Sequence, residues 1–347
     1  MQRRTHAGIV MFSPRLIDAM KSSLRRTLLA AGLAGSATLT TSVFVSPASA
    51  QTPLTIVMTF PAGSGVDFVG RLLQDSMQKS LGTNIVIEYR PGAAGNVASE
   101  YVARAKPDGH TILFGTAATH GVNAALYKKL SFDVEADFTP VSTIVDVSNV
   151  LTINPGVADV KTVRELIDLI RANPGKYNYA STGNGTGTHL AMADFVARTG
   201  LTITHIPYKG GPDAVASVVK GDVCCYMSQV QAMLPHYKAG KVRLLGVTTK
   251  ERVSAIPEVP TIAEAGVPGF ENYTWFGLFG PKNMDTVMLN KINAAVKTAL
   301  ETPAIRQRLI DAGNTPRWES PEQFRATVKA DRAKWAVIVK ASGATVD

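Results

Sequence analysis

The sequence predicts an α/β fold of two lobes, each built on a doubly wound sheet with helices on both faces. Three observations support this fold class. Strand-like and helix-like segments alternate along residues 51–347, which favours mostly parallel sheets. This stretch is roughly 300 residues long, more than one hydrophobic core usually holds. After residue 282 too few strand-like segments remain for another sheet, so the last helices must cover an existing one.

Residues 1–50 have the pattern of a secretory signal peptide. Lys21, Arg25 and Arg26 precede the apolar run TLLAAGLAG, and residues 48–50 are Ala-Ser-Ala. This pattern predicts cleavage before Gln51 and export to the periplasm. The apolar run is too short for a membrane anchor. The paired arginines leave twin-arginine export open as an alternative route.

The charge that remains after removal of residues 1–50 is small. The whole chain has a formal net charge of +9, whereas residues 51–347 carry 30 basic and 26 acidic side chains, a net +4. These residues contain no Lys/Arg block of the kind that binds nucleic acid, so we expect no nucleic-acid partner. A mild positive excess suits a protein that meets anionic small molecules.

The expected elements follow in order from apolar periodicity. Strand-like segments in the first half are 54–60, 84–89 and 110–115, with helices at 68–82 and around 97–102 between them. The same alternation returns with strands at 150–154, 177–181, 203–208 and 243–249, and with helices at 162–175, 190–200 and 212–221. A long strand at 273–282 and helices at 287–301 and 321–339 complete the chain.

The most economical arrangement of these elements has a discontinuous first domain. Residues 51–150 and 276–347 form domain 1, and residues 151–275 form an inserted domain 2. The chain would cross between them near 149–154 and again near 273–279, leaving a cleft between the domains. Ligands of doubly wound sheets bind beyond the carboxyl ends of the strands.

Four turns rich in glycine or hydroxyl side chains lie at such strand ends. They are PAGSGVD (61–67), GTAATHG (115–121), STGNGTGTH (181–189) and YKGG (208–211). A helix N-terminus leaves N–H groups unpaired and carries a partial positive charge, and Ser or Thr adds donors. Such turns favour a bound anion. For the first turn the alternative is a capped turn in which Asp67 satisfies nearby N–H groups.

Motifs for catalysis and cofactors are incomplete. A dinucleotide fingerprint would need Gly where Phe68 stands, and a nucleophile elbow around Ser64 would need Gly where Ala62 stands. The histidines lack metal-binding spacing, and His189 and His205 are expected to be hydrogen-bonded structural residues. We therefore expect no catalytic residue, metal or cofactor. The adjacent Cys224 and Cys225 are expected to be small core residues without a disulfide.

These turns, with several other segments, resemble the receptors of tripartite tricarboxylate transporters, the TctC or Bug family. The markers are FPAGSGVD, RPGAAGN, PDGHTILFG, DFTPV, YASTGNGTGTHL, HIPYKGG, EVPTIAEAGVPGFE and WFGLFGP, in order from about Pro53 to the C-terminus. Ser64, Tyr89 and Ala94 depart from the family pattern of Gly, Asn and Gly. The resemblance implies a two-lobed, flytrap-like periplasmic binding protein of type II architecture with no catalytic step.

The resemblance also implies what is bound and where. The ligand would be a small organic carboxylate, such as a di- or tricarboxylate, an acidic amino acid or an aromatic acid. A monomeric receptor would deliver it to membrane permease subunits of a tripartite tricarboxylate-type transporter. A ligand sensor with a signalling partner is the alternative, and an exported enzyme acting on a carboxylate is a more distant one. With Thr116 and Tyr208 from the turns above, the expected ligand-binding residues are Pro61, Ala62, Gly63, Ser64, Gly65, Asp67, Thr116, Ser181, Thr182, Gly183, Gly185, Thr186, Tyr208 and Lys209.

Overall fold

The structure, a computed structural model, describes residues 52–342. The predicted signal peptide lies outside the described residues. In the described part of the chain, no helix combines the length and the apolar character needed to cross a bilayer.

The first half of the chain alternates short strands with helices, as predicted. Its elements are β1 (Leu54–Met58), α2 (Gly65–Leu81), β2 (Ile85–Tyr89), η1 (Ala93–Gly95), α3 (Asn96–Ala103), β3 (Thr111–Thr116), η2 (Ala118–Val122), α4 (Asn123–Leu126) and β4 (Phe138–Ile153). The strand expected at 150–154 is therefore the end of a much longer strand, β4.

The rest of the chain repeats the alternation and ends in helices. Its elements are α5 (Val163–Ala172), β5 (Asn178–Ser181), α6 (Gly187–Thr199), β6 (Thr204–Pro207), α7 (Gly211–Lys220), β7 (Cys225–Gln229), α8 (Val230–Lys238), β8 (Arg243–Val247), β9 (Tyr273–Pro281), α9 (Thr286–Glu301), α10 (Pro303–Asp311), β10 (Asn314–Pro316) and α11 (Pro321–Ser342). The sequence did not predict β7, α8, α10 and β10 as separate elements.

The strands form one mixed sheet in the order β2-β1-β3-β9-β4-β7-β5-β6, with β8 and β10 also paired to β4. β1 pairs in parallel with β2 and β3, and β5 pairs in parallel with β6 and β7, as the alternation predicts. β4 pairs antiparallel with β9 and then with β7. The expected parallel pairing therefore holds on each side, while the long strands between them are antiparallel.

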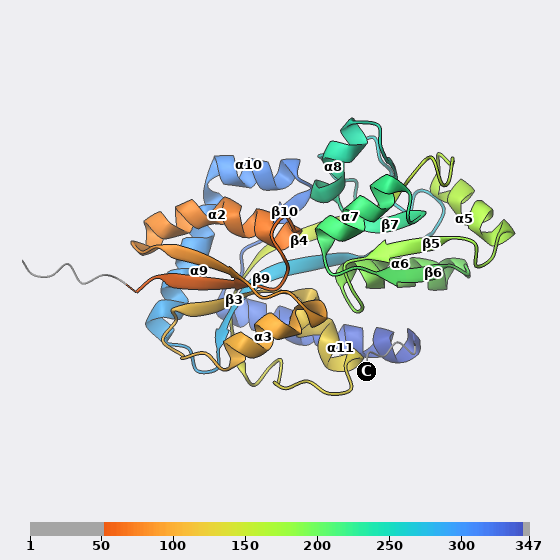
Figure 1. The fold of residues 1–347 in the computed structure, drawn as a ribbon. Helices are drawn as coiled ribbons and strands as arrows, with labels where there is room; N and C mark the ends of the chain where they lie inside the picture. Colours follow the sequence, from red (N-terminus) through yellow and green to blue (C-terminus); the bar gives the residue numbers. More distant parts are fainter. Residues whose placement is uncertain (1–51, 343–347) are drawn as a thin grey trace, which may run out of the picture. The chain divides into compact units, whose positions relative to one another are not determined.

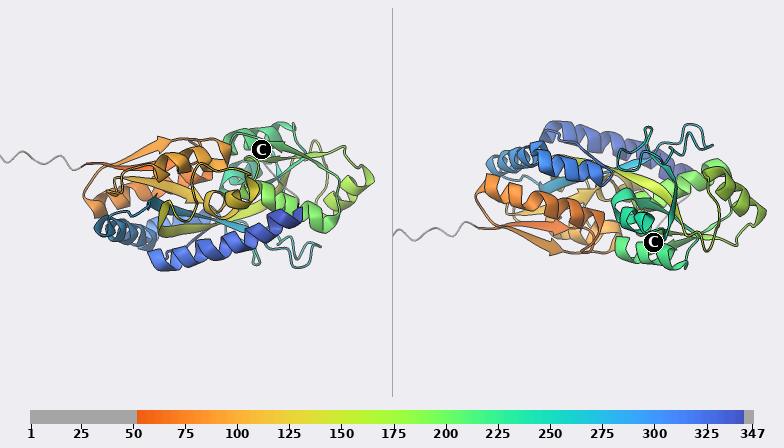
Figure 2. Two further views of the ribbon diagram at one scale, coloured as in Figure 1. Left: turned by 90° about the horizontal axis from the view of Figure 1, so that it is seen from below. Right: turned by 90° about the horizontal axis from the view of Figure 1, so that it is seen from above.

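The long strands connect two groups of elements. Figure 1 shows β1–β3, α2, α3 and α9 at one end of β4 and β9, and α5–α8 with β5–β7 at the other. Figure 2 shows α11, in dark blue, lying lengthwise beside the strands. The largest hydrophobic clusters follow this grouping, because two contain residues from 54–147 and 275–328 and two contain residues from 150–270.

Local sequence signals set several helix ends. Thr162 caps α5 by accepting a hydrogen bond from Glu165 N at 3.1 Å, and the Glu165 carboxylate accepts from Lys161 N at 2.6 Å, a close variant of the predicted capping box. α7 has proline in its first turn and ends at Gly221 in a left-handed conformation, as predicted. Cys224 and Cys225 are buried free thiols, which confirms their prediction as core residues.

Candidate functional site

The first loop, residues 59–67, connects β1 to α2, and the Asp67 carboxylate fixes its shape. Asp67 accepts hydrogen bonds from Gly63 N at 2.8 Å, from Arg71 Nε at 2.8 Å and from the Tyr89 hydroxyl. Gly63 has φ +78°, a left-handed conformation that favours glycine. Ser64 caps α2 through its hydroxyl, which accepts from Asp67 N at 3.4 Å. The first loop is thus held by a nearly buried carboxylate.

The second loop, residues 181–189, connects β5 to α6 and is held by its own hydroxyl groups. Thr188 Oγ1 accepts from Thr182 N at 3.0 Å and lies 3.0 Å from Thr182 Oγ1 and 3.1 Å from Thr186 Oγ1. Thr186 Oγ1 also donates to Gly183 O at 2.8 Å. Gly183 and Gly185 have φ of +126° and +76°. Three threonine hydroxyls are therefore gathered at the start of α6.

Two stacked imidazoles, those of His189 and His205, hold the second loop by hydrogen bonds. His189 Nδ1 accepts a hydrogen bond from Gly185 N at 3.1 Å, and His205 Nε2 lies 2.7 Å from Ser181 Oγ. The two rings stack with centroids 4.1 Å apart. Burial lowers the pKa of His189 to about 4, and burial together with the charge of His189 lowers the pKa of His205 to about 3. Both rings are neutral at pH 7, as structural histidines are expected to be.

The two loops face each other across an inner chamber of about 30 Å³. Its walls come from the ends of β1, β3, β7 and β9 and from the second loop. Its lining residues are Phe60, Thr116, Ala118, Thr182, Thr186, Gly187, Thr188, Gln229, Thr274 and Phe276. Five of these are threonines, and within the described chain the lining includes no Asp, Glu, Lys, Arg or His. The chamber therefore offers hydroxyls and an amide to a small polar group.

An outer cavity of about 540 Å³ adjoins this chamber, and Phe60 and Thr182 line both. Its other lining residues are Pro61, Pro91, Gly92, Ala93, Ala94, Gly95, Tyr127, Gly183, Asn184, Tyr208, Lys209 and Asp213. The first loop and the 208–211 turn touch at its edge, because a methyl group added at Gly210 would lie 2.8 Å from Pro61 Cγ. Chamber and cavity together are large enough for a small organic molecule.

One wall of the outer cavity has an unusual backbone. Residues 92–95 all have positive φ, and two of them, Ala93 at +46° and Ala94 at +52°, are not glycine. Asn123 Nδ2 donates to Ala94 O at 3.3 Å and to Asn96 Oδ1 at 2.6 Å, which holds this segment against η2 and α4. Left-handed alanines store strain, and such strain is often found at binding sites.

A side cavity of about 780 Å³ lies on the other side of the first loop, between α2, α8 and α10. Gly63, Ser64, Gly65, Asp67 and Arg71 line it. It receives no residue of the second loop. Among the cavities described here, which are formed by residues 52–342, the chamber and the outer cavity bring the two loops together, so we take them as the candidate ligand site.

The structure places the residues predicted to bind ligand in five different surroundings. Thr116, Thr182 and Thr186 line the inner chamber, and Pro61, Gly183, Tyr208 and Lys209 line the outer cavity. Gly63, Ser64, Gly65 and Asp67 line the side cavity. Ser181 and Gly185 are buried in the supporting bonds of the second loop, and Ala62 is exposed.

Sequence reasoning missed several lining residues. Gln229 and Thr274 lie on β7 and β9 without any local motif, so only the sheet topology reveals them. The 91–95 segment lies in the quoted motif RPGAAGN and could have been included from sequence. Phe60 directly precedes the first turn, and Thr188 lies within the second.

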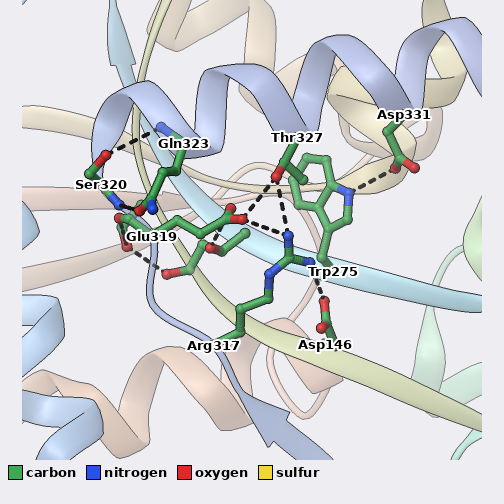
Figure 3. Close-up of polar contacts among 10 residues, drawn as sticks. Asp146, Trp275, Arg317, Glu319, Ser320, Gln323, Thr327 and Asp331 are labelled. Atoms are coloured by element: carbon green, nitrogen blue, oxygen red, sulfur yellow. Dashed lines mark hydrogen bonds and ion pairs between the residues drawn. The ribbon is translucent and has the colours of Figure 1, made fainter.

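The strand β9 separates this site from a charged cluster on its other face. Thr274 and Phe276 line the chamber, and Trp275 between them donates from Nε1 to Asp331 Oδ2 at 2.8 Å. Figure 3 shows Arg317 between Asp146, at 3.0 Å, and Glu319, at 2.6 Å, with Thr327 at 3.1 Å. Burial raises the pKa of Asp146, although Arg317 opposes this. The cluster connects β4 and α11 to the segment that follows β10.

Comparison with known proteins gives a consistent result. The sequence profile of TctC, the tripartite tricarboxylate transporter family receptor, matches residues 69–344. Protein BugT of Bordetella pertussis is 32% identical over 311 residues, which cover 88% of this chain and 95% of BugT.

Comparison with solved structures gives relatives of the same kind. A Rhodopseudomonas palustris protein solved with adipate is 33% identical, with a TM-score of 0.82 over 85% of this chain and 99% of that one. MatC of Rhodopseudomonas palustris, solved with bound malate, is 32% identical, with a TM-score of 0.78 over 83% of this chain and 98% of MatC.

Proposed function

This chain belongs to the tripartite tricarboxylate transporter receptor family, TctC, and on that premise we propose that it captures a small organic carboxylate in the periplasm and delivers it to membrane permease subunits. Receptors of this family are periplasmic solute-binding proteins, and the relatives described above were solved with adipate and malate. The proposal includes export directed by residues 1–50, a monomeric receptor and no catalytic step.

The observation that carries the proposal is the convergence of two loops on one chamber without charged side chains. The second loop brings Thr182, Thr186 and Thr188 to it, and Thr116 enters from the end of β3. Hydroxyl and amide donors can surround a carboxylate once the threonine hydroxyls rotate out of their bonds within the second loop. Each hydrogen bond to a charged group contributes about 1.5–3 kcal/mol. In this proposal the carboxylate enters the inner chamber and the remainder of the ligand occupies the outer cavity.

The other predicted residues would act indirectly. Asp67 holds the first loop through Gly63, and Ser181 joins the second loop to His205. Ligand binding would close two domains, residues 51–150 with 276–347 and residues 151–275, by bending within β4 and β9. The closed form is favoured because it alone brings both loops to the ligand.

A thermal-shift screen of organic acids tests the proposal. A ligand at one hundred times its Kd should stabilise the protein by about 2.7 kcal/mol. The variant Thr182→Val should lose most of this stabilisation because it removes a chamber hydroxyl. Thr202→Val, at an exposed position outside the inner chamber and the outer cavity, is the matched control. If no mono-, di- or tricarboxylate, acidic amino acid or aromatic acid stabilises the protein, the proposed function is wrong.

Delivery to a transporter needs a separate measurement. Deleting the gene should abolish uptake of the identified acid by cells, and the wild-type chain should restore uptake. The Thr182→Val variant should restore it poorly. Normal uptake in the deletion strain would instead point to a receptor that serves a signalling partner.

A further inference from the structure

The inner chamber has a polar lining and room for one compact group. Its volume is about 30 Å³, so it admits one small group and no more. Five threonines and Gln229 supply its polar atoms, while Phe60 and Phe276 close it. Because its lining in the described chain holds no cationic side chain, a second negative charge brought into it would find no compensation.

The outer cavity is of a different kind, with mostly apolar and aromatic walls. Its apolar and aromatic lining residues are Phe60, Pro61, Pro91, Ala93, Ala94, Tyr127 and Tyr208. Tyr127 is buried enough that its pKa is raised by desolvation. Such walls reward apolar surface and penalise an additional charge.

The charged residues of the outer cavity give no net attraction for an anion. Lys209 is its one cationic lining residue in the described chain, and Asp213 lines the same cavity. Both side chains belong to exposed residues, so water screens them. The second end of a dicarboxylate therefore has no built site here.

We infer, on the basis of the proposed function, that the ligand is a monocarboxylate with an apolar body rather than a short dicarboxylate. The carboxylate occupies the inner chamber, and the aliphatic or aromatic body lies between Tyr127 and Tyr208 in the outer cavity. This chain would then differ in preference from relatives that were solved with adipate and malate.

Chain length provides the first test. Each buried methylene group should raise affinity about fourfold, so affinity should rise steadily from propionate through butyrate to hexanoate. Isothermal titration of the purified protein, unfolded and refolded to remove any co-purified ligand, measures this series. A flat series would contradict an apolar site for the ligand body.

Matched pairs of acids provide the decisive test. Butyrate and succinate have the same length, as do hexanoate and adipate, and each pair differs by one carboxylate. We expect each monocarboxylate to bind roughly tenfold or more tightly than its partner, because the second charge loses hydration without gaining a counter-ion. Tighter binding of succinate or adipate would overturn this inference but leave the proposed function intact. Failure of all acids to bind would overturn the proposed function itself.

A variant localises the effect. Tyr127→Ser removes an aromatic wall of the outer cavity, so the affinity ratio of hexanoate to propionate should fall several-fold. The matched control is Tyr237→Ser on α8. The Tyr237 hydroxyl donates to Glu258 outside the inner chamber and the outer cavity, so this variant should keep the wild-type ratio. An unchanged ratio in a folded Tyr127→Ser protein would place the ligand body elsewhere and contradict the inference. The wild-type series decides the question if that variant does not fold.

Discussion

Asp67 receives hydrogen bonds from residues that are near in sequence and from one that is remote. Gly63 and Arg71 lie four residues before and after it, and Tyr89 lies at the end of β2. Arg71 is exposed, whereas the Asp67 side chain is only 9% exposed, so the carboxylate carries the structural role. The geometry therefore favours a role for Asp67 in shaping the first loop over one in touching the ligand.

Replacing Asp67 should therefore weaken both the fold and the site. Asp67→Ala leaves Gly63 N and the Tyr89 hydroxyl without their acceptor and should lower the free energy of unfolding by about 1.5–3 kcal/mol. Denaturant unfolding measures this loss, and titration should show weaker carboxylate binding. Asp75→Ala, at an exposed position on the same helix, is the control and should change neither quantity appreciably. Equal effects of the two variants would refute the assigned role.

His189 and His205 make stability depend on pH. Burial lowers the pKa of both rings below the ordinary 6.5, to about 4 and about 3. Between these values and pH 6.5 the unfolded chain binds more protons than the folded chain. Their contribution to stability is therefore complete above pH 6.5 and is lost as the pH falls toward 4.

Acid should accordingly destabilise the second loop and the protein. Each histidine should cost about 1.4 kcal/mol of unfolding free energy per pH unit below 6.5. In His189→Asn, unfolding measured between pH 6.5 and 5 should show a slope smaller by about that amount. Thr202→Val, which changes no titratable group, is the control and should keep the wild-type slope. A wild-type slope in His189→Asn would show that His189 does not titrate as its burial requires.

At the scale of elements, the segment that leads into α3 holds two alanines in a glycine-like conformation. Ala94 lies in η1 with φ +52° and ψ +33°. A left-handed alanine costs about 1–2 kcal/mol, and glycine at that position would avoid this cost while losing about 0.5–1 kcal/mol to unfolded-state entropy. The difference favours glycine slightly.

Ala94→Gly should therefore stabilise the protein by roughly 0.5–1 kcal/mol, against the usual effect of glycine. Denaturant unfolding measures the change. Ala294→Gly, at an exposed position inside α9, is the matched control and should destabilise by about 1 kcal/mol. A loss of stability in both variants would mean that the segment relaxes around Ala94 without strain.

Elements also differ in how well sequence predicts them. β1, α2 and α5 have clear periodicity and capping residues, so their positions follow from local chemistry. β4 begins at Phe138 and contains Pro140, Ser142 and Thr143, residues that do not indicate a strand in the sequence. Its first half is recognised only from its pairing with β9 and β10. α8 contains Pro235, which argues against a helix in sequence, yet tertiary packing retains it. The same holds for the site, since the loops are local signals whereas Gln229 and Thr274 depend on strand pairing.

At the scale of the whole molecule, the division of the core supports the proposed hinge. The main hydrophobic clusters separate at about residue 150 of β4, although one smaller cluster crosses the boundary by joining Leu190 to Val122, Leu126 and Trp335. A core made of separate clusters can bend at the strands that connect them more easily than one continuous core. The contact between the first loop and the 208–211 turn offers a way to test the proposed closure of the two domains.

Gly210 provides that test because replacing it with alanine adds only a methyl group, which acts through steric contact. It precedes α7 with φ 169°, an extended conformation open to any residue, and an added methyl would lie 2.8 Å from Pro61 Cγ. Gly210→Ala should therefore push the 208–211 turn away from the first loop and lower ligand affinity roughly tenfold or more, with little change in stability. Small-angle scattering with saturating ligand should show a larger radius of gyration. At Gly211 the same methyl would lie 3.8 Å from Ser64 Cα, an ordinary contact, so Gly211→Ala is the matched control. If Gly210→Ala binds and compacts as Gly211→Ala does, the first loop and the 208–211 turn need not meet, and closure of two domains around the ligand is not how this receptor works.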